Sequence, residues 1–210
     1  MDYLQQLIER YPVLSGIQDN IAATYRLMAD TFAAGGKVLI AGNGGSAADS
    51  DHIVGELMKG FLKKRPLSAD FTAKLQKLTD IDTSNYIARN IQQGLPAIAL
   101  SAHTALTTAC INDIDGSIIY AQQVYGYGQP GDLFLGISTS GNAKNVLYAM
   151  ITAKARGLKA AALTGGTGGE IAKIADVAVI VPETETYRVQ ELHLPVYHAL
   201  CLMLEEHFFP

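Results

Sequence analysis

Five short runs of apolar residues are spaced along the chain, and each run lies next to glycine, proline or aspartate. Near-continuous apolar runs, in contrast to alternating ones, are typical of strands that are buried on both faces of a parallel sheet. The predicted strands are Lys37–Ala41, Pro96–Leu100, Asp132–Ile137, Leu158–Leu163 and Asp176–Val181. We therefore expect five parallel strands at the centre of the fold.

Between these strands, the apolar residues follow the spacing of amphipathic helices. The predicted helices are Ser46–Lys59, Thr104–Ile111, Ser117–Tyr125, Asn142–Arg156 and Gly169–Ile174. Strands that alternate with helices form a parallel sheet with helices on both faces. The predicted fold class is therefore α/β, a three-layer sandwich with a five-stranded parallel sheet flanked by helices.

Both ends of the chain are predicted to be helical. Apolar residues at helical spacing over Tyr3–Ile8 and Ile17–Phe32 predict an N-terminal helical pair. A long C-terminal helix is predicted over Thr186–His207, with a kink at Pro195, because proline removes one backbone hydrogen bond. The opening pair must bury its apolar stripe on a later element or on another chain.

The segment Gly60–Gly94 breaks this alternation. It is polar, contains the basic run Lys63–Arg65 and holds one or two short helical stretches. Because connections between elements usually span a few residues, this segment is too long for an ordinary loop. We expect a single domain over residues 1–210, with an excursion at about 60–94 that covers the site or makes a subunit contact.

Composition narrows the class of protein. The 210 residues are 49% hydrophobic, which is enough for a sizeable core. A net charge of −4 argues against a nucleic-acid partner. No run of about 18 apolar residues is present, so no membrane span is expected. The two cysteines, Cys110 and Cys201, are expected to be small core residues, and so few cysteines fit a reducing cytoplasm.

A glycine turn follows the first predicted strand. Residues Gly42–Ser46 lead into a helix, and backbone N–H groups at a helix N-terminus attract anions. Gly42, Gly44 and Ala47 also fit the loose dinucleotide pattern G-x-G-x-x-G/A, but no acidic residue follows at the distance that a ribose contact requires. A nicotinamide cofactor and a turn without a ligand remain as alternatives.

A second turn places three hydroxyl groups, Ser138, Thr139 and Ser140, after the third strand along the chain. Ligands of open α/β sheets bind beyond the carboxyl ends of strands, and hydroxyl and N–H donors would suit a phosphate there. The alternative is a helix cap with spare hydroxyls. A third turn, Gly165–Gly169, is either structural or part of the site.

Two pairs of polar residues have spacings that suit a shared site. His52 and Glu56 lie four residues apart on one helix face, as a metal-binding pair or as a hydrogen-bonded pair. Gln190 and His198 lie eight residues apart on the last helix and can converge. The other histidines are expected to be surface or core residues, namely His103, His193 and His207.

The motifs GNGGSAADSDHIVGEL, Asn112–Asp113, GISTSGNAKNV and QELHLPVYH together resemble the sugar isomerase (SIS) family, and within it the bacterial phosphoheptose isomerases. The resemblance implies a homotetramer with sites between subunits. It implies an aldose–ketose isomerase that converts sedoheptulose 7-phosphate to D-glycero-D-manno-heptose 7-phosphate through an enediol. It also implies one zinc ion per site, with His52, Glu56, Gln190 and His198 as ligands.

By the same resemblance, Glu56 and His198 form the catalytic acid/base pair. The implied substrate-binding residues are Asn43, Gly44, Gly45, Ser46, Asn112, Asp113, Ser138, Thr139, Ser140 and Gln190. Two positions depart from the family pattern, because Ala143 replaces a common serine and Tyr187 replaces a frequent acid. The alternatives are a non-catalytic SIS scaffold that binds the replication initiator protein, and an SIS enzyme for another phosphosugar.

Overall fold

The computed structural model describes residues 2–210, so Met1 of the predicted domain lies outside the described residues. Its centre is a sheet of five strands, β1 (Val38–Ala41), β2 (Ala97–Ala99), β3 (Leu133–Ser138), β4 (Lys159–Gly165) and β5 (Val177–Val181). The strands are all parallel and lie in the order β2-β1-β3-β4-β5. The five predicted strands are confirmed, and the chain reverses its direction of progress across the sheet between β1 and β3.

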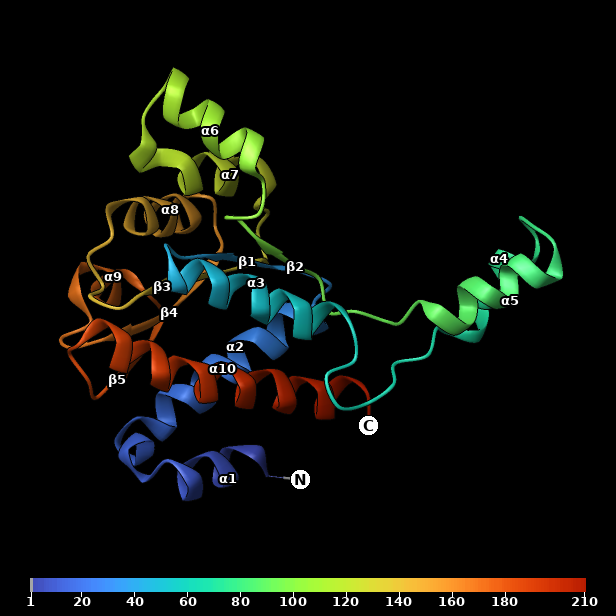
Figure 1. Cartoon of the computed structure of the whole chain (residues 1–210), viewed down its shortest axis with the longest axis horizontal. Coiled ribbons are helices and arrows are strands. Elements are labelled where there is room, and N and C mark those ends of the chain that lie inside the picture. The colour runs from blue at the N-terminus through green and yellow to red at the C-terminus, as the bar shows by residue number, and fades with distance from the viewer. Residues whose placement is uncertain (1) are drawn as a thin grey trace.

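Helices cover both faces of this sheet, as the three-layer prediction required (Figure 1). One face carries α1 (Tyr3–Arg10), α2 (Gln18–Ala33), α3 (Gly45–Met58) and α10 (Thr186–Phe208). The other face carries α6 (Thr104–Asp113), α7 (Ile119–Tyr127), α8 (Lys144–Ala155) and α9 (Gly169–Ile174). Short 3₁₀ turns, η1 (Pro12–Ile17) and η2 (Gly116–Ile118), precede α2 and α7.

Side chains along each strand point alternately into two cores. In β1, Val38 and Ile40 pack toward α2, α3 and α10, whereas Leu39 and Ala41 pack toward α7 and α8, and all four are fully buried. Both faces therefore need apolar residues, which explains why the strand sequences do not alternate with polar residues.

The N-terminal helical pair packs on α10, so the pair covers a later element of the same chain. Leu7 of α1 and Ile21 of α2 are buried in the same core as Leu200 of α10. The Phe32 and Phe208 rings meet edge to face with centroids 6.1 Å apart. Pro195 lies inside α10, which is assigned as one continuous helix, and the kink there stays a prediction.

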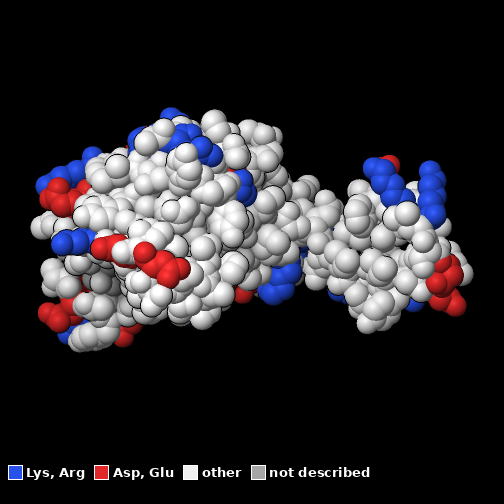
Figure 2. Space-filling model, turned by 90° about the horizontal axis from the view of Figure 1, so that it is seen from above, with Lys and Arg blue, Asp and Glu red and all other residues white. Residues whose placement is uncertain are grey.

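The excursion forms a helical hairpin that projects from the body, built from α4 (Ala69–Gln76) and α5 (Ile81–Asn90) (Figure 1). We call residues 67–91 the arm. Among the described residues, α4 buries no side chain and α5 buries only Ser84. Large apolar side chains are exposed on it, including Leu78 (82%) and Tyr86 (70%). Figure 2 shows the arm joined to the body by a narrow stalk.

Candidate functional site

A cavity of about 370 Å³ lies where the two predicted ligand-binding turns meet. β1 and β3 are neighbours, and the chain reverses between them, so the turns that follow them lie side by side. The cavity is lined by Asn43, Gly44, Gly45, Ser46, Ile137, Ser138, Thr139, Ser140, Ala143, Thr186 and Gln190. Strand order alone therefore brings segments about 95 residues apart in the sequence to one pocket.

The first turn is held by side chains from the opposite helical layer. The Tyr120 hydroxyl donates to the Gly42 carbonyl at 2.6 Å. The amides of Asn43 and Asn145 exchange two hydrogen bonds of 2.9 Å each, which link this turn to α8. These bonds fix the turn before any ligand binds, because each partner is itself anchored in a helix.

Glycine at the start of α3 lets the last helix approach the turn. Gly44 has a φ of +55°, which L side chains rarely adopt. A Cβ on Gly45 would collide with the side-chain amide of Gln190. Gln190 thus reaches the cavity from α10 by resting against a residue that has no side chain.

The second turn is supported by the third glycine turn. Gly141 has a φ of +67°, and its missing Cβ would collide with the Gly168 carbonyl. The Gly165 amide donates to the Thr139 carbonyl, and the Ile171 amide donates to the Gly141 carbonyl, both at 3.0 Å. Gly165–Gly169 does not line the cavity, so its role in the described structure is to hold the second turn.

Helix α8 starts at Lys144, two residues later than the predicted start. The Asn142 side chain donates to the Ser140 carbonyl and accepts from the Glu170 amide, which extends the turn by these residues. The N-cap is Ala143, which makes no side-chain hydrogen bond. The start of α8 reaches the cavity at Ala143, and the Val146 amide donates to the Asn145 side chain at 3.0 Å.

Eight of the ten predicted substrate-binding residues line this cavity. The two exceptions are Asn112 and Asp113, which are exposed at the end of α6. The Asn112 amide donates to the Asp113 carboxylate at 2.7 Å. Within the described chain, these two residues therefore lie outside the cavity lining.

A second group of predicted site residues lies where α3 and α10 pack together. His52 Nε2 lies 3.3 Å from Glu56 Oε1. The His52 and His198 rings meet edge to face with centroids 5.0 Å apart. Gln190 lies eight residues before His198, which corresponds to about 12 Å along the helix. The structure thus brings together three of the four predicted zinc ligands and places the fourth, Gln190, in the cavity.

Tyr197 and Asp49 orient His52. The Tyr197 hydroxyl donates to Asp49 Oδ1 at 3.2 Å and lies 3.0 Å from His52 Nδ1. Burial and the Asp49 charge raise the pKa of Tyr197, so its single proton stays in place. His52 is thus held at Nδ1 by the Tyr197 hydroxyl, while its Nε2 faces the Glu56 carboxylate.

His198 and Glu56 have different surroundings. His198 Nε2 is buried and has no hydrogen-bond partner among the described residues. Burial, reinforced by His52 and opposed by Glu56, lowers the pKa of His198, which favours the neutral imidazole. Glu56 Oε2 lies 3.2 Å from Lys59 Nζ, and its side chain is mostly buried. The Glu56 carboxylate and the neutral His198 imidazole therefore lie in the same cluster.

The donor types of this cluster suit zinc. Two imidazoles and a carboxylate are common zinc ligands, and Nε2 of His198 is buried with no partner among the described residues, which leaves it available to a metal. Across residues 2–210, no group of three histidine, cysteine or acidic side chains is close enough to form a ready metal centre. The chemistry of the residues fits the ion, and the spacing would have to tighten around it.

The other predicted histidines and cysteines are structural. His193 is fully buried and lies 3.2 Å from the Thr164 carbonyl, while His103 caps α6 by accepting from the Leu106 amide. His207 lies 2.8 Å from the Tyr25 hydroxyl. Both cysteines are free and buried. These side chains lie outside the cluster, as expected.

Several residues of the site carried no recognised signal in the sequence. Asp49 and Tyr197 stand inside the motifs that contain His52 and His198, so proximity along the chain could have indicated them. Thr186 lines the cavity one turn before Gln190 on the same helix. Tyr120 and Asn145 are far from the turn that they hold, and the sequence gives no sign of those contacts.

None of the described helices is long and apolar enough to cross a membrane.

The chain matches the family model for the SIS domain over residues 2–97 and 92–165. It is 41% identical to a phosphoheptose isomerase of Nitratiruptor over 82% of this chain and 78% of that protein. It is 42% identical to one of Chlorobaculum parvum over 89% of this chain and 78% of that protein.

A solved structure has the same architecture. The phosphoheptose isomerase from Francisella tularensis superposes with a TM-score of 0.77 and 29% identity, over 97% of this chain and 95% of that one. The family model, the sequence relatives and the solved structure all point to one family and one architecture. The chain therefore belongs to the SIS domain family, and its relatives there are the phosphoheptose isomerases.

Proposed function

We propose that this chain is an aldose–ketose isomerase that converts sedoheptulose 7-phosphate to D-glycero-D-manno-heptose 7-phosphate. The observation that carries the proposal is the pairing of a hydroxyl-lined cavity with a carboxylate–imidazole cluster on the two helices that flank it. The names of the relatives at 41% and 42% identity support the same reaction and substrate.

The cavity would bind the phosphate. Ser138, Thr139 and Ser140 offer hydroxyl donors, and Ser46 lines the opposite side. The start of α8 adds backbone amides, which favour an anion. Ala143 contributes no hydroxyl where relatives of this family commonly have serine, so Ser46 would supply the remaining donor. A neutral cradle binds phosphate while still allowing the product to leave.

The cluster would move the protons of the isomerisation. The Glu56 carboxylate takes a proton from C1 of the ketose and returns it to C2, through an enediolate. The His198 imidazole moves a proton between the oxygens on C1 and C2, and its lowered pKa keeps it neutral for that exchange. Tyr197 and Asp49 hold the neighbouring His52 ring in place.

We propose that His52, Glu56 and His198 hold a zinc ion, with Gln190 as the fourth ligand implied by the family. Zinc would supply Lewis-acid polarisation of the substrate carbonyl. The support in this chain is the donor chemistry and the unpartnered nitrogen of His198. Glu56 then has two tasks, to ligate and to transfer a proton.

We also propose that the protein assembles as a homo-oligomer, a tetramer by family. The arm exposes large apolar side chains, and Asn112 and Asp113 lie outside the cavity of their own chain, which supports sites completed by a second copy. Light scattering of dilute protein tests this. A mass of about 22 kDa, that of a single chain, would contradict it.

The isomerase proposal is tested with purified protein and a panel of ketose phosphates, with metal content measured in the same samples. We expect sedoheptulose 7-phosphate to be converted, and solvent deuterium to enter at C2 of the aldose, because an enediol exchanges its proton with the base. If no phosphosugar is turned over with zinc supplied, the scaffold alternative replaces the isomerase.

A further inference from the structure

A buried ion pair lies at the root of the arm, outside the cavity and outside the predicted site. Arg65 Nη2 lies 2.9 Å from Glu205 Oε1, and the two side chains are 0% and 2% exposed. Arg65 Nε donates to the same oxygen at 3.0 Å. Removing two charges from water lowers stability unless further hydrogen bonds compensate for the lost hydration. The other hydrogen-bond partners of this pair therefore show what the pair holds in place.

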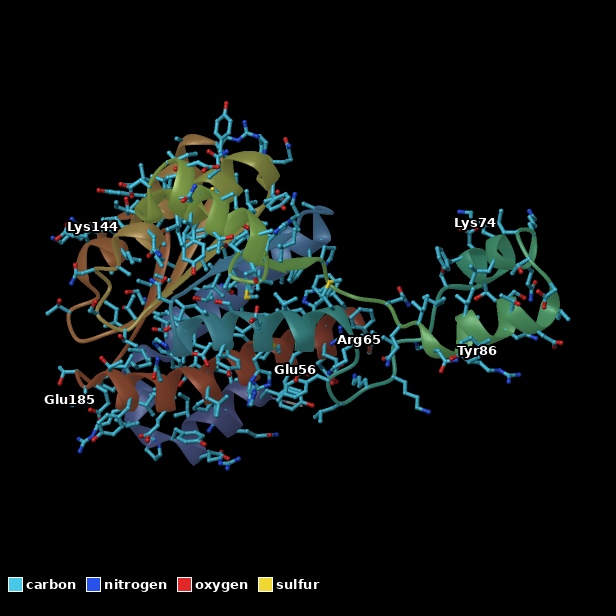
Figure 3. All side chains as sticks on the ribbon, turned by 45° about the horizontal axis from the view of Figure 1, so that its top comes forward. Glu56, Arg65, Lys74, Tyr86, Lys144 and Glu185 are labelled. Carbon is cyan, nitrogen blue, oxygen red and sulfur yellow. The ribbon has the colours of Figure 1, made fainter. Side chains whose placement is uncertain are left out.

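The remaining donors of Arg65 reach the end of α3. Nη1 donates to the Leu57 carbonyl at 2.7 Å, and Nη2 donates to the Glu56 carbonyl at 3.1 Å. The last carbonyls of a helix have no hydrogen-bond partner within the helix. The guanidinium group of Arg65 donates a hydrogen bond to each of two such carbonyls. Arg65 thus binds the backbone of the residue proposed as the catalytic base, and Figure 3 shows Arg65 close to Glu56 at the arm root.

Glu205 connects the same point to α10. It lies seven residues after His198, which is two helical turns, so both side chains lie on nearly the same face. Its carboxylate also accepts from the amides of Phe61, Leu62 and Lys63 at 2.7–3.1 Å. One ion pair therefore joins the end of α3, the start of the excursion and the helix that carries His198.

We propose that Arg65 and Glu205 are positioning residues for the reaction, because they set the spacing between Glu56 and His198. This inference rests on the proposed function. Arg65 holds the Glu56 backbone, Glu205 fixes Arg65 to α10, and the Glu56 carboxylate is thereby placed relative to the His198 imidazole. Catalysis is sensitive to such spacing, since a misplacement of about 1 Å can lower the rate about 100-fold.

The test variant is Arg65→Lys. Lysine keeps the positive charge opposite Glu205 but lacks the planar fork that reaches both carbonyls and the carboxylate. We expect kcat for sedoheptulose 7-phosphate to fall about tenfold or more, with KM within about twofold of the wild type. The KM should hold because the phosphate-binding turns lie at the other end of α3.

A control separates positioning from general stability. Lys37 pairs with Asp132 at 2.6 Å, just before β1, and neither residue belongs to the cluster. Lys37→Met loses an ion pair and should lower the thermal midpoint while kcat stays within about twofold of the wild type. The thermal midpoint is measured for both variants. If both are destabilised but kcat falls only in Arg65→Lys, the loss of kcat reflects positioning and not stability.

If Arg65→Lys does not fold, the double variant Arg65→Gln with Glu205→Gln replaces it, because two neutral amides leave no uncompensated charge. The same loss of kcat is expected. An active wild type with unchanged kcat in the variant would overturn this inference and leave the proposed function standing. An inactive wild type would overturn both.

Discussion

The proposed phosphate cavity and the proposed acid–base cluster are built in different ways. The cavity is made of turns that follow β1 and β3, so strand order positions it and glycines give it shape. The cluster is made of side chains on α3 and α10, so the packing of two helices and a few buried hydrogen bonds position it. Substitutions in the cavity should therefore change binding, whereas substitutions around the cluster should change turnover.

The largest effect is expected from Glu56→Gln. Loss of the base should lower kcat by about 10³-fold or more, since general acid–base groups contribute about 10²–10⁴-fold. Phosphate binding by the cavity should remain, and zinc content should fall because an amide replaces a carboxylate. Steady-state kinetics and metal analysis measure these changes.

The control for this variant is His207→Gln, which lies on α10, the helix of His198, but outside the cluster. It should retain kcat within about twofold. His193→Ala is a poorer control, because His193 is fully buried and alanine would leave a cavity. Wild-type turnover in Glu56→Gln would show that the catalytic assignment is wrong.

The second largest effect is expected from a substitution inside the cluster. Tyr197→Phe keeps the ring but removes the hydroxyl that contacts His52 and Asp49. Loss of an orienting partner typically costs about 10–100-fold in metal affinity or activity, so kcat and zinc retention should both fall in that range. KM should change little. A variant with a raised KM and unchanged kcat would place Tyr197 with the cavity instead.

A smaller effect, on binding alone, is expected from Ser140→Ala. Loss of one donor to a charged group costs about 1.5–3 kcal/mol, so KM for the phosphosugar should rise about tenfold or more. The thermal midpoint should stay close to the wild type. Unchanged phosphate affinity would mean that the turn is a helix cap, without a role in binding.

The smallest effect on activity is expected at His193. This residue lies on α10 between Gln190 of the cavity and His198 of the cluster. Burial lowers its pKa from 6.5 to about 4, so the unfolded chain binds a proton more readily than the folded one. The stability from neutral His193 is present above pH 6.5 and is lost as the pH falls toward 4, by up to about 1.4 kcal/mol per unit.

His193→Gln should flatten this pH dependence of the unfolding free energy, measured with denaturant between pH 7 and pH 4. Activity at pH 7 should change little, because His193 faces the Thr164 carbonyl and not the cluster. An equally steep pH dependence in the variant would assign the effect to other groups.

The sequence predicts the cavity better than the cluster, for a physical reason. Each turn is a local pattern of strand, glycine and helix start, so Gly44 and Ser140 can be placed without knowing distant contacts. Arg65 reads as part of a basic run in a polar segment, yet it is fully buried against Glu205, 140 residues away. Such pairing depends on tertiary packing that no local pattern contains.

The same reasoning explains the other differences between the sequence predictions and the structure. Asn112 and Asp113 belong to a family motif but end a helix on the surface of their own chain, so the sequence predicts their importance and not their position. The excursion was expected from its length and polarity, and its two helices follow from N-caps at Ser68 and Asp80. The sequence gives no sign of the direction in which the arm projects.

The position of α10 in the chain has a consequence for how the protein is made. This helix follows every other element of the fold, yet it packs against α1, α2 and α3 and carries His198. When all five strands have been synthesised, the sheet face that carries α1, α2 and α3 still lacks α10. Because domains emerge from the N-terminus onward, that face and the proposed catalytic centre are completed in the same late step of biosynthesis.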